Sequence, residues 1–149
     1  MKNLSEPYSD QVFHLYLSLQ RHSRQYARQL LDEKELTPRD FSVLRYLLEI
    51  ESAPVGQIQT YLHKSPSTTS TLLAQLEEKG YVTRTRSQED NRVVIVALTP
   101  IGLEIAKNTP LGGLPLLRRQ LGHLSETRLA EIEGVLQEIM HLMEISETE

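Results

Sequence analysis

Residues 55–99 read VGQIQTYLHKSPSTTSTLLAQLEEKGYVTRTRSQEDNRVVIVALT, and this stretch decides the fold. Its pattern predicts, in order, a short helix, a turn, a second helix, a strand, a polar loop and a second strand. Ser65 is suited to cap the second helix and Pro66 to open it, because the first helical position needs no amide proton. Gly80 is expected to end this helix. Its buried side is predicted from three leucines at helical spacing: Leu72, Leu73 and Leu76.

The opposite face of the second helix carries short, uncharged, hydrogen-bonding side chains. They are Ser67, Ser70, Thr71 and Gln75. Such a face is either simply solvated or reads base edges in a major groove while the amides of the first turn meet a phosphate. The sequence around the helix favours the second interpretation.

The two strands and the polar loop between them predict a hairpin after the second helix. Arg84 and Arg86 lie on the first strand, and Asp90 and Arg92 lie near the hairpin tip. Arg92 is placed to enter a minor groove, a narrow and negatively charged slot that suits arginine. We expect Asp90 to hold its guanidinium by a charge-assisted bond. The alternative is an ordinary exposed Asp–Arg pair, which contributes little.

Helix, turn, helix and hairpin in this order form a winged helix-turn-helix. Residues 36–107 resemble the MarR family, the multiple antibiotic resistance regulators. The matching segments are LTPRDFSVLRYL, SPSTTSTLLAQLEEKGYVTR, the wing motif EDNR, and VALTPIG. The Asp-x-Arg wing motif of the family matches Asp90 and Arg92. Its Leu-Thr-x-x-Gly motif, which opens the next helix, matches Leu98, Thr99 and Gly102.

The resemblance implies a mainly α fold with a small β-hairpin wing. Residues 37–99 would form the DNA-binding lobe, and residues 1–34 and 100–149 the N- and C-terminal dimerisation helices, of a single domain spanning 1–149. The function implied is a repressor that binds double-stranded DNA as a homodimer, at two half-sites about 34 Å apart in a pseudo-palindrome. The predicted DNA-binding residues are Ser65, Ser67, Thr68, Ser70, Thr71, Arg84, Arg86, Asp90 and Arg92.

Composition limits the class of protein. The chain has 149 residues, 39% of them hydrophobic, and a net charge of −4. With no cysteine it can form no disulfide and no thiol sensor, which excludes the cysteine-based peroxide sensing of some MarR relatives. No apolar run predicts a membrane span, and the N-terminus lacks the core of a signal peptide, so we expect a cytoplasmic protein.

The negative charge is concentrated away from the predicted DNA-binding surface. Residues 63–92 contain five basic and four acidic residues, whereas residues 108–149 contain three basic and seven acidic, a balance of −4. This modest electrostatic footprint predicts moderate DNA affinity that falls with salt.

Helices are expected on both sides of the lobe. One spans about residues 8–33, Thr37 and Pro38 open the next, residues 52–54 break it, and Ser125 caps the last. Apolar residues along the first and last helices predict a dimer interface rather than a contact within one chain. The predicted dimerisation residues are Val12, Leu15, Leu19, Leu129, Ile132, Leu136, Ile139 and Met143.

Residues 108–115, NTPLGGLP, depart from the family pattern of one long helix. Two prolines and two glycines predict a kinked or interrupted helix here. The sequence leaves open which of the two occurs.

Two further expectations rest on the resemblance. Family members often carry a basic residue where this chain has Thr71, so the bidentate contact to guanine is lost and a site rich in A and T is expected. A small aromatic ligand is the effector that the resemblance implies, although the ligand-binding residues are unknown from sequence. Candidates that are equally suited to core or surface are His14, Tyr16, His22, Arg24 and Tyr26.

Other classes of function fit less well. The chain shows no phosphate-binding glycine loop, nucleophile motif or paired acid and base, so it is not expected to be an enzyme or to need a cofactor. The five histidines do not show the sequence spacing of metal ligands, so a metal-responsive regulator would require the fold to bring them together. They are His14, His22, His63, His123 and His141. A winged helix used only for protein–protein contact would not need Arg92.

Overall fold

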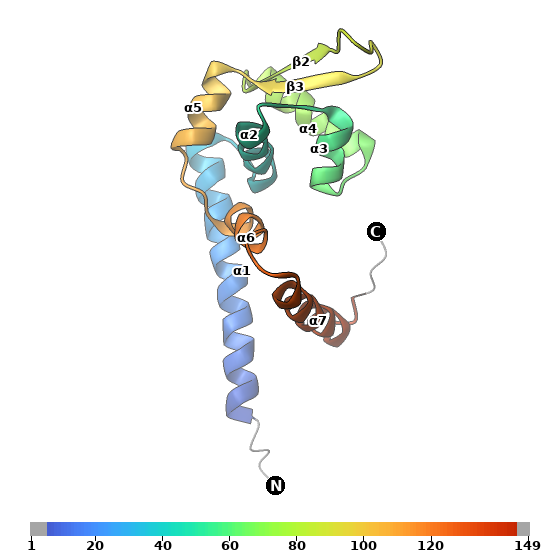
Figure 1. Ribbon diagram of the computed structural model, residues 1–149. Helices are drawn as coiled ribbons and strands as arrows, with labels where there is room; N and C mark the ends of the chain where they lie inside the picture. The colour runs from blue at the N-terminus through green and yellow to red at the C-terminus, as the bar shows by residue number, and fades with distance from the viewer. Residues whose placement is uncertain (1–5, 146–149) are drawn as a thin grey trace. The chain divides into compact units, whose positions relative to one another are not determined.

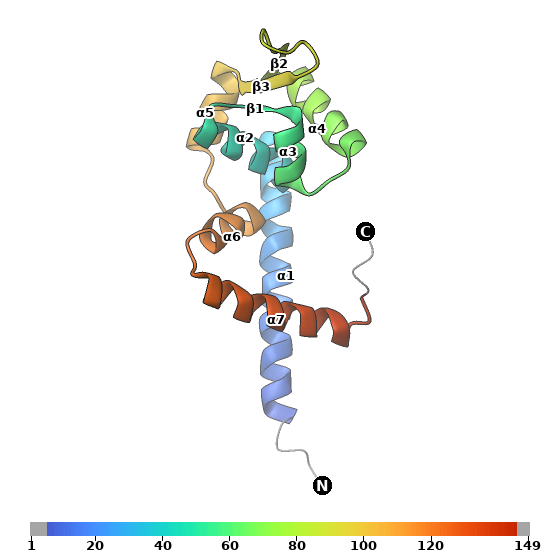
Figure 2. The same cartoon turned by 45° about the vertical axis from the view of Figure 1, so that its right-hand side comes forward.

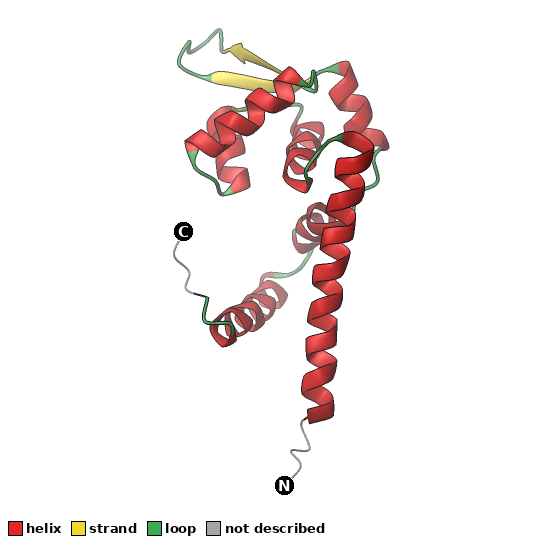
Figure 3. Cartoon of the chain, turned by 180° about the vertical axis from the view of Figure 1, so that it is seen from behind, coloured by secondary structure: helices red, strands yellow, loops and turns green. Residues whose placement is uncertain are grey.

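The structure, a computed structural model, describes residues 6–145 and consists mainly of helices (Figures 1 and 3). The elements are α1 (Glu6–Lys34), α2 (Pro38–Ile50), β1 (Ser52–Pro54), α3 (Val55–Leu62), α4 (Pro66–Glu78), β2 (Val82–Arg86), β3 (Val94–Leu98), α5 (Pro100–Asn108), α6 (Gly113–Leu121) and α7 (Glu126–Leu142). This order confirms the predicted mainly α fold with a winged helix-turn-helix. The ends of the predicted dimerisation segments, residues 1–5 and 146–149, lie outside the described residues.

Local capping sets the starts of the helices, as the sequence predicts. The Thr37 hydroxyl accepts a hydrogen bond from the Asp40 amide at 3.1 Å, and Oδ2 of Asp40 accepts one from the Thr37 amide at 2.8 Å. Ser65, Thr99 and Ser125 likewise accept from an amide in the first turn of α4, α5 and α7. Each cap satisfies a donor that the helix itself cannot pair.

One hydrophobic core joins α2, the helix-turn-helix and the sheet. Phe41, Leu44 and Leu47 of α2 are completely buried against Ile58 of α3. The three predicted leucines of α4 are buried as well, which confirms that face. Since α4 contributes its apolar side to this core, its polar side is left to solvent.

The sheet has three antiparallel strands in the order β1-β3-β2, and Figure 2 shows β1 beside β3. Residues 52–54, expected only to break the helix, also form a strand: Ala53 pairs with Val96, and Pro54 with Ile95. A three-residue strand is too short to show an alternating pattern. Pro54 fits it because proline, with no amide proton, is tolerated at an edge strand.

The proline- and glycine-rich segment interrupts the helix rather than kinking it. α5 ends at Asn108 and α6 starts at Gly113, whose φ is +53°. The Tyr26 hydroxyl donates a hydrogen bond to the Pro110 carbonyl at 3.2 Å. Burial raises the pKa of Tyr26. A Cβ on Gly112 or Gly113 would lie within 2.7 Å of the Tyr26 ring, so only glycine lets the segment lie this close.

Beyond this segment the chain divides into two compact units, one ending at Pro115 and one starting at Leu116. The second unit contains the rest of α6 and all of α7. The predicted roles of a lobe at residues 37–99 and of flanking dimerisation helices stay predictions. Among the described residues, no helix has both the length and the apolar character needed to cross a membrane.

Candidate DNA-binding site

The exposed face of α4 is the centre of the candidate site. A left-handed residue, His63 with φ +51°, ends α3 and turns the chain into α4. Figures 1 and 2 show the two helices next to each other under the sheet. All five polar residues predicted for α4 and its cap are exposed: Ser65, Ser67, Thr68, Ser70 and Thr71. The residue between them, Thr69, is completely buried.

The hydroxyls on α4 pair with one another and with their own helix. The Ser65 hydroxyl shares hydrogen bonds with those of Ser67 at 3.1 Å and Thr68 at 2.9 Å. Thr71 donates to the Ser67 carbonyl at 3.0 Å. Because these groups are exposed, they can exchange these partners for base edges or phosphates at little cost.

The wing loop is shaped by its own hydrogen bonds. The Ser87 hydroxyl accepts bonds from the amides of Glu89 and Asp90, at 3.2 and 3.4 Å. A guanidinium nitrogen of Arg86 donates to the Asn91 carbonyl at 2.7 Å, across the loop. Arg86 therefore stabilises the loop, and its contact with DNA stays a prediction.

The structure corrects the expected role of Asp90. Its Oδ1 accepts a hydrogen bond from the Arg92 backbone amide at 2.9 Å and does not hold the Arg92 guanidinium. The short aspartate side chain is suited to such a bond two residues along the chain, and it fixes the turn. Within residues 6–145, no side chain pairs with the Arg92 guanidinium, which is exposed and free to bind a partner.

Arg84 is placed differently from Arg92. Its Nε donates to Oε2 of Glu77 at 2.8 Å, a second guanidinium nitrogen lies 2.6 Å from the same oxygen, and its backbone amide donates to Oε1 at 3.2 Å. This hydrogen bonding lowers the pKa of the Glu77 carboxyl. The pair therefore links Glu77, near the end of α4, to the middle of β2 in the wing. The contact of Arg84 with DNA stays a prediction.

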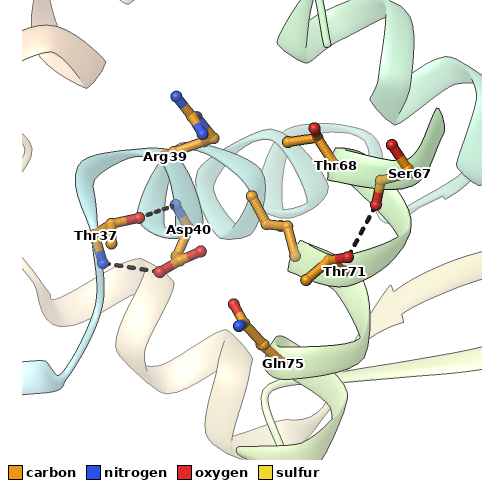
Figure 4. Close-up of a pocket in the computed structure, with 8 residues that line it drawn as sticks. Thr37, Arg39, Asp40, Ser67, Thr68, Thr71 and Gln75 are labelled. Atoms are coloured by element: carbon orange, nitrogen blue, oxygen red, sulfur yellow. Dashed lines mark hydrogen bonds between the residues drawn. The ribbon is translucent and has the colours of Figure 1, made fainter. Parts of the chain in front are cut away.

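Two hollows flank the exposed face of α4. The first, called the α2 cleft, has a volume of about 390 Å³ and lies between the start of α2 and α4 (Figure 4). Its lining residues are Thr37, Arg39, Asp40, Ser67, Thr68, Thr71, Leu72 and Gln75. The second, called the wing groove, has a volume of about 490 Å³. Its lining residues are Pro54, Val55, Gly56, Ser70, Leu73, Arg84, Arg92, Val93 and Val94.

Arg39 is a residue of this site that the sequence pattern does not predict. Arg39 lies in the first turn of α2, far along the chain from α4, and the fold alone brings it beside Thr68 and Thr71. One feature of the sequence could have indicated it: Arg39 directly follows Thr37-Pro38, a pair that predicts a helix start, where side chains are often exposed.

The residues predicted for dimerisation include many exposed apolar side chains. Val12, Leu15 and Leu19 of α1 are exposed, Leu19 to 69%, as are Leu136 and Met143 in the second unit. Leu129, Ile132 and Ile139 are partly buried. The dimer interface stays a prediction.

The ligand-pocket candidates do not converge. The Tyr16 hydroxyl and Arg24 both bond to Gln20, at 2.7 and 3.1 Å, along one face of α1. Tyr26 instead packs on the glycine pair described above. His14 and His22 are exposed. In the described part of the chain, no three His, Asp or Glu side chains gather closely enough to hold a metal ion.

These elements define a class: a winged helix-turn-helix with a polar recognition helix and an arginine at the wing. The MarR family model matches residues 36–94. A Bacillus subtilis HTH-type transcriptional regulator, YsmB, is 26% identical over 80% of this chain and 82% of its own length. The organic hydroperoxide resistance transcriptional regulator of B. subtilis is 34% identical over 60% of each chain.

Solved structures agree on the fold. The Streptococcus pneumoniae FabT structure in complex with DNA superimposes with a TM-score of 0.63 at 21% identity, covering 92% of this chain and 97% of FabT. The S. aureus MepR–DNA complex gives 0.61 at 21% identity, over 87% and 96%. Residues 36–94 thus resemble the MarR family, and the match, the relatives and the DNA complexes together support a DNA-binding transcriptional regulator.

Proposed function

We propose that the protein is a repressor that binds a pseudo-palindromic operator as a homodimer and acts in the cytoplasm. In each half-site α4 enters the major groove, and Arg92 enters the adjacent minor groove. The observation that carries this proposal is the pairing of an exposed hydroxyl face on α4 with an unpaired guanidinium at the wing. Hydroxyls can read base edges, and an arginine without a protein partner is suited to a narrow minor groove.

A dimer is proposed for two reasons. One helix in one major groove makes few base contacts, whereas two copies read two half-sites one helical turn apart. Within the first unit, α1 also exposes apolar side chains at helical spacing: Tyr8, Val12, Leu15 and Leu19. Contiguous exposed apolar surface of this kind is typical of an interface.

The recognition face predicts the preferred bases. Among the described residues of α4, the exposed side facing the α2 cleft has no cation, so Thr71 offers a methyl and a hydroxyl instead of a bidentate guanine contact. A methyl group packs well on the C5-methyl of thymine. We therefore expect half-sites rich in A and T.

Release by a small molecule is the regulatory part of the proposal. A crystal structure of a MepR-like protein was obtained with pseudoligands, and it shares this fold with a TM-score of 0.59 at 18% identity. A small aromatic ligand that changes the spacing of the two lobes would alter affinity without touching α4. The chain has no cysteine, so a thiol-based peroxide signal is excluded.

Selection of duplexes from a random pool by the purified protein, at two salt concentrations, tests the operator. Enrichment of a palindrome with half-sites about 34 Å apart would support the proposal. The Arg92→Ala variant should bind the enriched duplex at least tenfold more weakly, with Arg128→Ala in α7 as the charge-matched control. If no sequence is enriched and Arg92→Ala binds like the wild type, the wing is not a DNA-reading element, and a protein-binding winged helix becomes the better description.

A further inference from the structure

The α2 cleft lies directly beside the helix that is proposed to read DNA. Figure 4 shows Thr37, Arg39 and Asp40 on its α2 side and Ser67, Thr68, Thr71 and Gln75 on its α4 side. Four of these α4 residues are exposed, and three of them carry hydroxyls. The cleft therefore combines neutral hydrogen-bonding groups with one cation, Arg39.

The carboxylate in the cleft, that of Asp40, is buried and already accepts a hydrogen bond. Asp40 is only 8% exposed, and its Oδ2 accepts the Thr37 amide at 2.8 Å. By contrast, Arg39 is exposed, and no side chain within the described residues pairs with its guanidinium. Asp40 keeps its negative charge but is largely buried, so the exposed charge in the cleft is that of Arg39.

The end of α2 contributes little beyond this side chain. The amides of Thr37 and Asp40 are consumed by the reciprocal cap, and Pro38 has no amide proton. Binding in the cleft therefore depends on the Arg39 guanidinium as the exposed cation, with the Arg39 backbone amide and the hydroxyls of α4 as neutral donors. This makes the site removable by a single substitution at an exposed position.

The two hollows lie on the two sides of α4, where a helix in a major groove meets the DNA backbone. A major groove is about 12 Å wide and a helix with its side chains about 10–12 Å across, so a helix in the groove has a sugar–phosphate backbone on each side. Each hollow contains an arginine whose guanidinium has no side-chain partner among residues 6–145: Arg39 in the α2 cleft and Arg92 in the wing groove.

We propose that the α2 cleft holds a backbone phosphate of the DNA strand on the α2 side of α4, with Arg39 as its cation. The inference rests on the proposed function, since it requires α4 in the major groove. Arg39 lies outside the groove, on a different helix from the base-reading residues. It positions α4 on the duplex and carries no sequence preference of its own.

The test measures the affinity of Arg39→Ala, Arg39→Lys and wild type for two 30-bp duplexes, one enriched by selection and one of scrambled sequence, at several salt concentrations. Removing one phosphate contact per protomer of a dimer should lower the slope of log K against log salt by about 2 and the affinity roughly 60-fold at 0.1 M salt. Both duplexes should be affected equally, and Arg39→Lys should keep most of the slope. Arg28→Ala on α1, with the same change in charge at another exposed arginine, should leave the slope unchanged.

Single methylphosphonate linkages, which are uncharged, locate the phosphate. One position per half-site should weaken wild-type binding and have no further effect on Arg39→Ala. Inorganic phosphate, added at constant ionic strength, should not compete with DNA. If Arg39 instead holds a free anion, added phosphate will change wild-type affinity only, and no methylphosphonate position will couple to Arg39.

Three results would overturn the inference. The first is an Arg39→Ala variant that binds like Arg28→Ala while the wild type still binds the selected duplex, which leaves the proposed function intact. The second is a loss confined to the selected duplex with an unchanged salt slope, which would mean that Arg39 reads bases. The third is failure of the wild type to bind any duplex, which would overturn the proposed function as well.

Discussion

The glycine of the Leu-Thr-x-x-Gly motif provides the sharpest test of the packing beneath the wing. Gly102 lies in the first turn of α5, and a Cβ there would lie 1.9 Å from the Tyr81 carbonyl oxygen and 2.9 Å from its carbon. Ordinary carbon–oxygen contacts begin at about 3.3 Å, so Gly102→Ala forces the two backbones apart by about 1.4 Å. Tyr81 directly precedes β2, so the displacement reaches the wing.

The cost can be estimated from the contacts that must move. Overpacking a tight site costs about 1–3 kcal/mol. The Thr99 amide donates to the same Tyr81 carbonyl at 3.1 Å, and the Thr99 hydroxyl donates to the Gly80 carbonyl at 2.5 Å; weakening them costs about 1 kcal/mol each. Alanine is more favourable than glycine in a helix by about 1 kcal/mol. The free energy of unfolding should therefore fall by about 3 kcal/mol, and the melting temperature by about 10 °C.

Thermal and urea unfolding, followed by circular dichroism at equal protein concentrations, measure this loss. Gly56→Ala is the matched control, because a Cβ there meets nothing within 4 Å, and it should be neutral or slightly stabilising. DNA affinity should fall in Gly102→Ala through displacement of the wing. A Gly102→Ala protein that melts within 2 °C of the wild type would refute the reasoning, because it would mean that α5 and Tyr81 separate at negligible cost.

Three further substitutions test other parts of the fold, each by thermal unfolding. Thr69→Val should stabilise the protein by about 1 kcal/mol, since the buried Thr69 hydroxyl has no hydrogen-bond partner within the described residues; a loss of stability would show that the hydroxyl is paired. Glu77→Gln should be less stable than the wild type near neutral pH and equally stable in acid. The bond from Arg84 lowers the pKa of Glu77, so the stabilisation by the ionised carboxylate is lost as the pH falls through that lowered value; a stability difference that is constant across pH would contradict this. Gly113→Ala should lower stability by about 2 kcal/mol through its positive φ and its contact with the Tyr26 ring, and Tyr26→Leu should relieve only the second part; full stability in Gly113→Ala would mean that residues 109–113 rearrange freely.

The order of the elements could be predicted from the sequence because each helix start depends on hydrogen bonds within a few residues. Thr37, Ser65, Thr99 and Ser125 each bond to an amide three residues away, so a short segment contains both the signal and the partner. Prolines follow three of these caps and fix the first helical position. The polar face of α4 was readable for a related reason, since helical spacing alone separates it from the buried leucines.

Parts of the candidate site were not readable in this way. Sequence placed Arg84 and Arg92 together as wing arginines, but Glu77 pairs with Arg84 and leaves Arg92 free. The expected bond between Asp90 and the Arg92 guanidinium was replaced by one to the backbone, because a short side chain reaches a nearby amide more easily than a flexible guanidinium. Arg39 was not recognised at all, since nothing near it in the chain indicates α4.

Sequence alone was therefore enough to predict the starts of α2, α4, α5 and α7, a break or kink at residues 108–115, and the face of α4 that stays polar. All of these depend on hydrogen bonds and steric limits within a few residues. Only the tertiary structure decided that β1 pairs with β3, that Arg84 and Arg92 differ in freedom, and that Arg39 lies beside the recognition helix. Those outcomes depend on contacts between distant segments, which form only when the shared core brings α2, α4 and the sheet together.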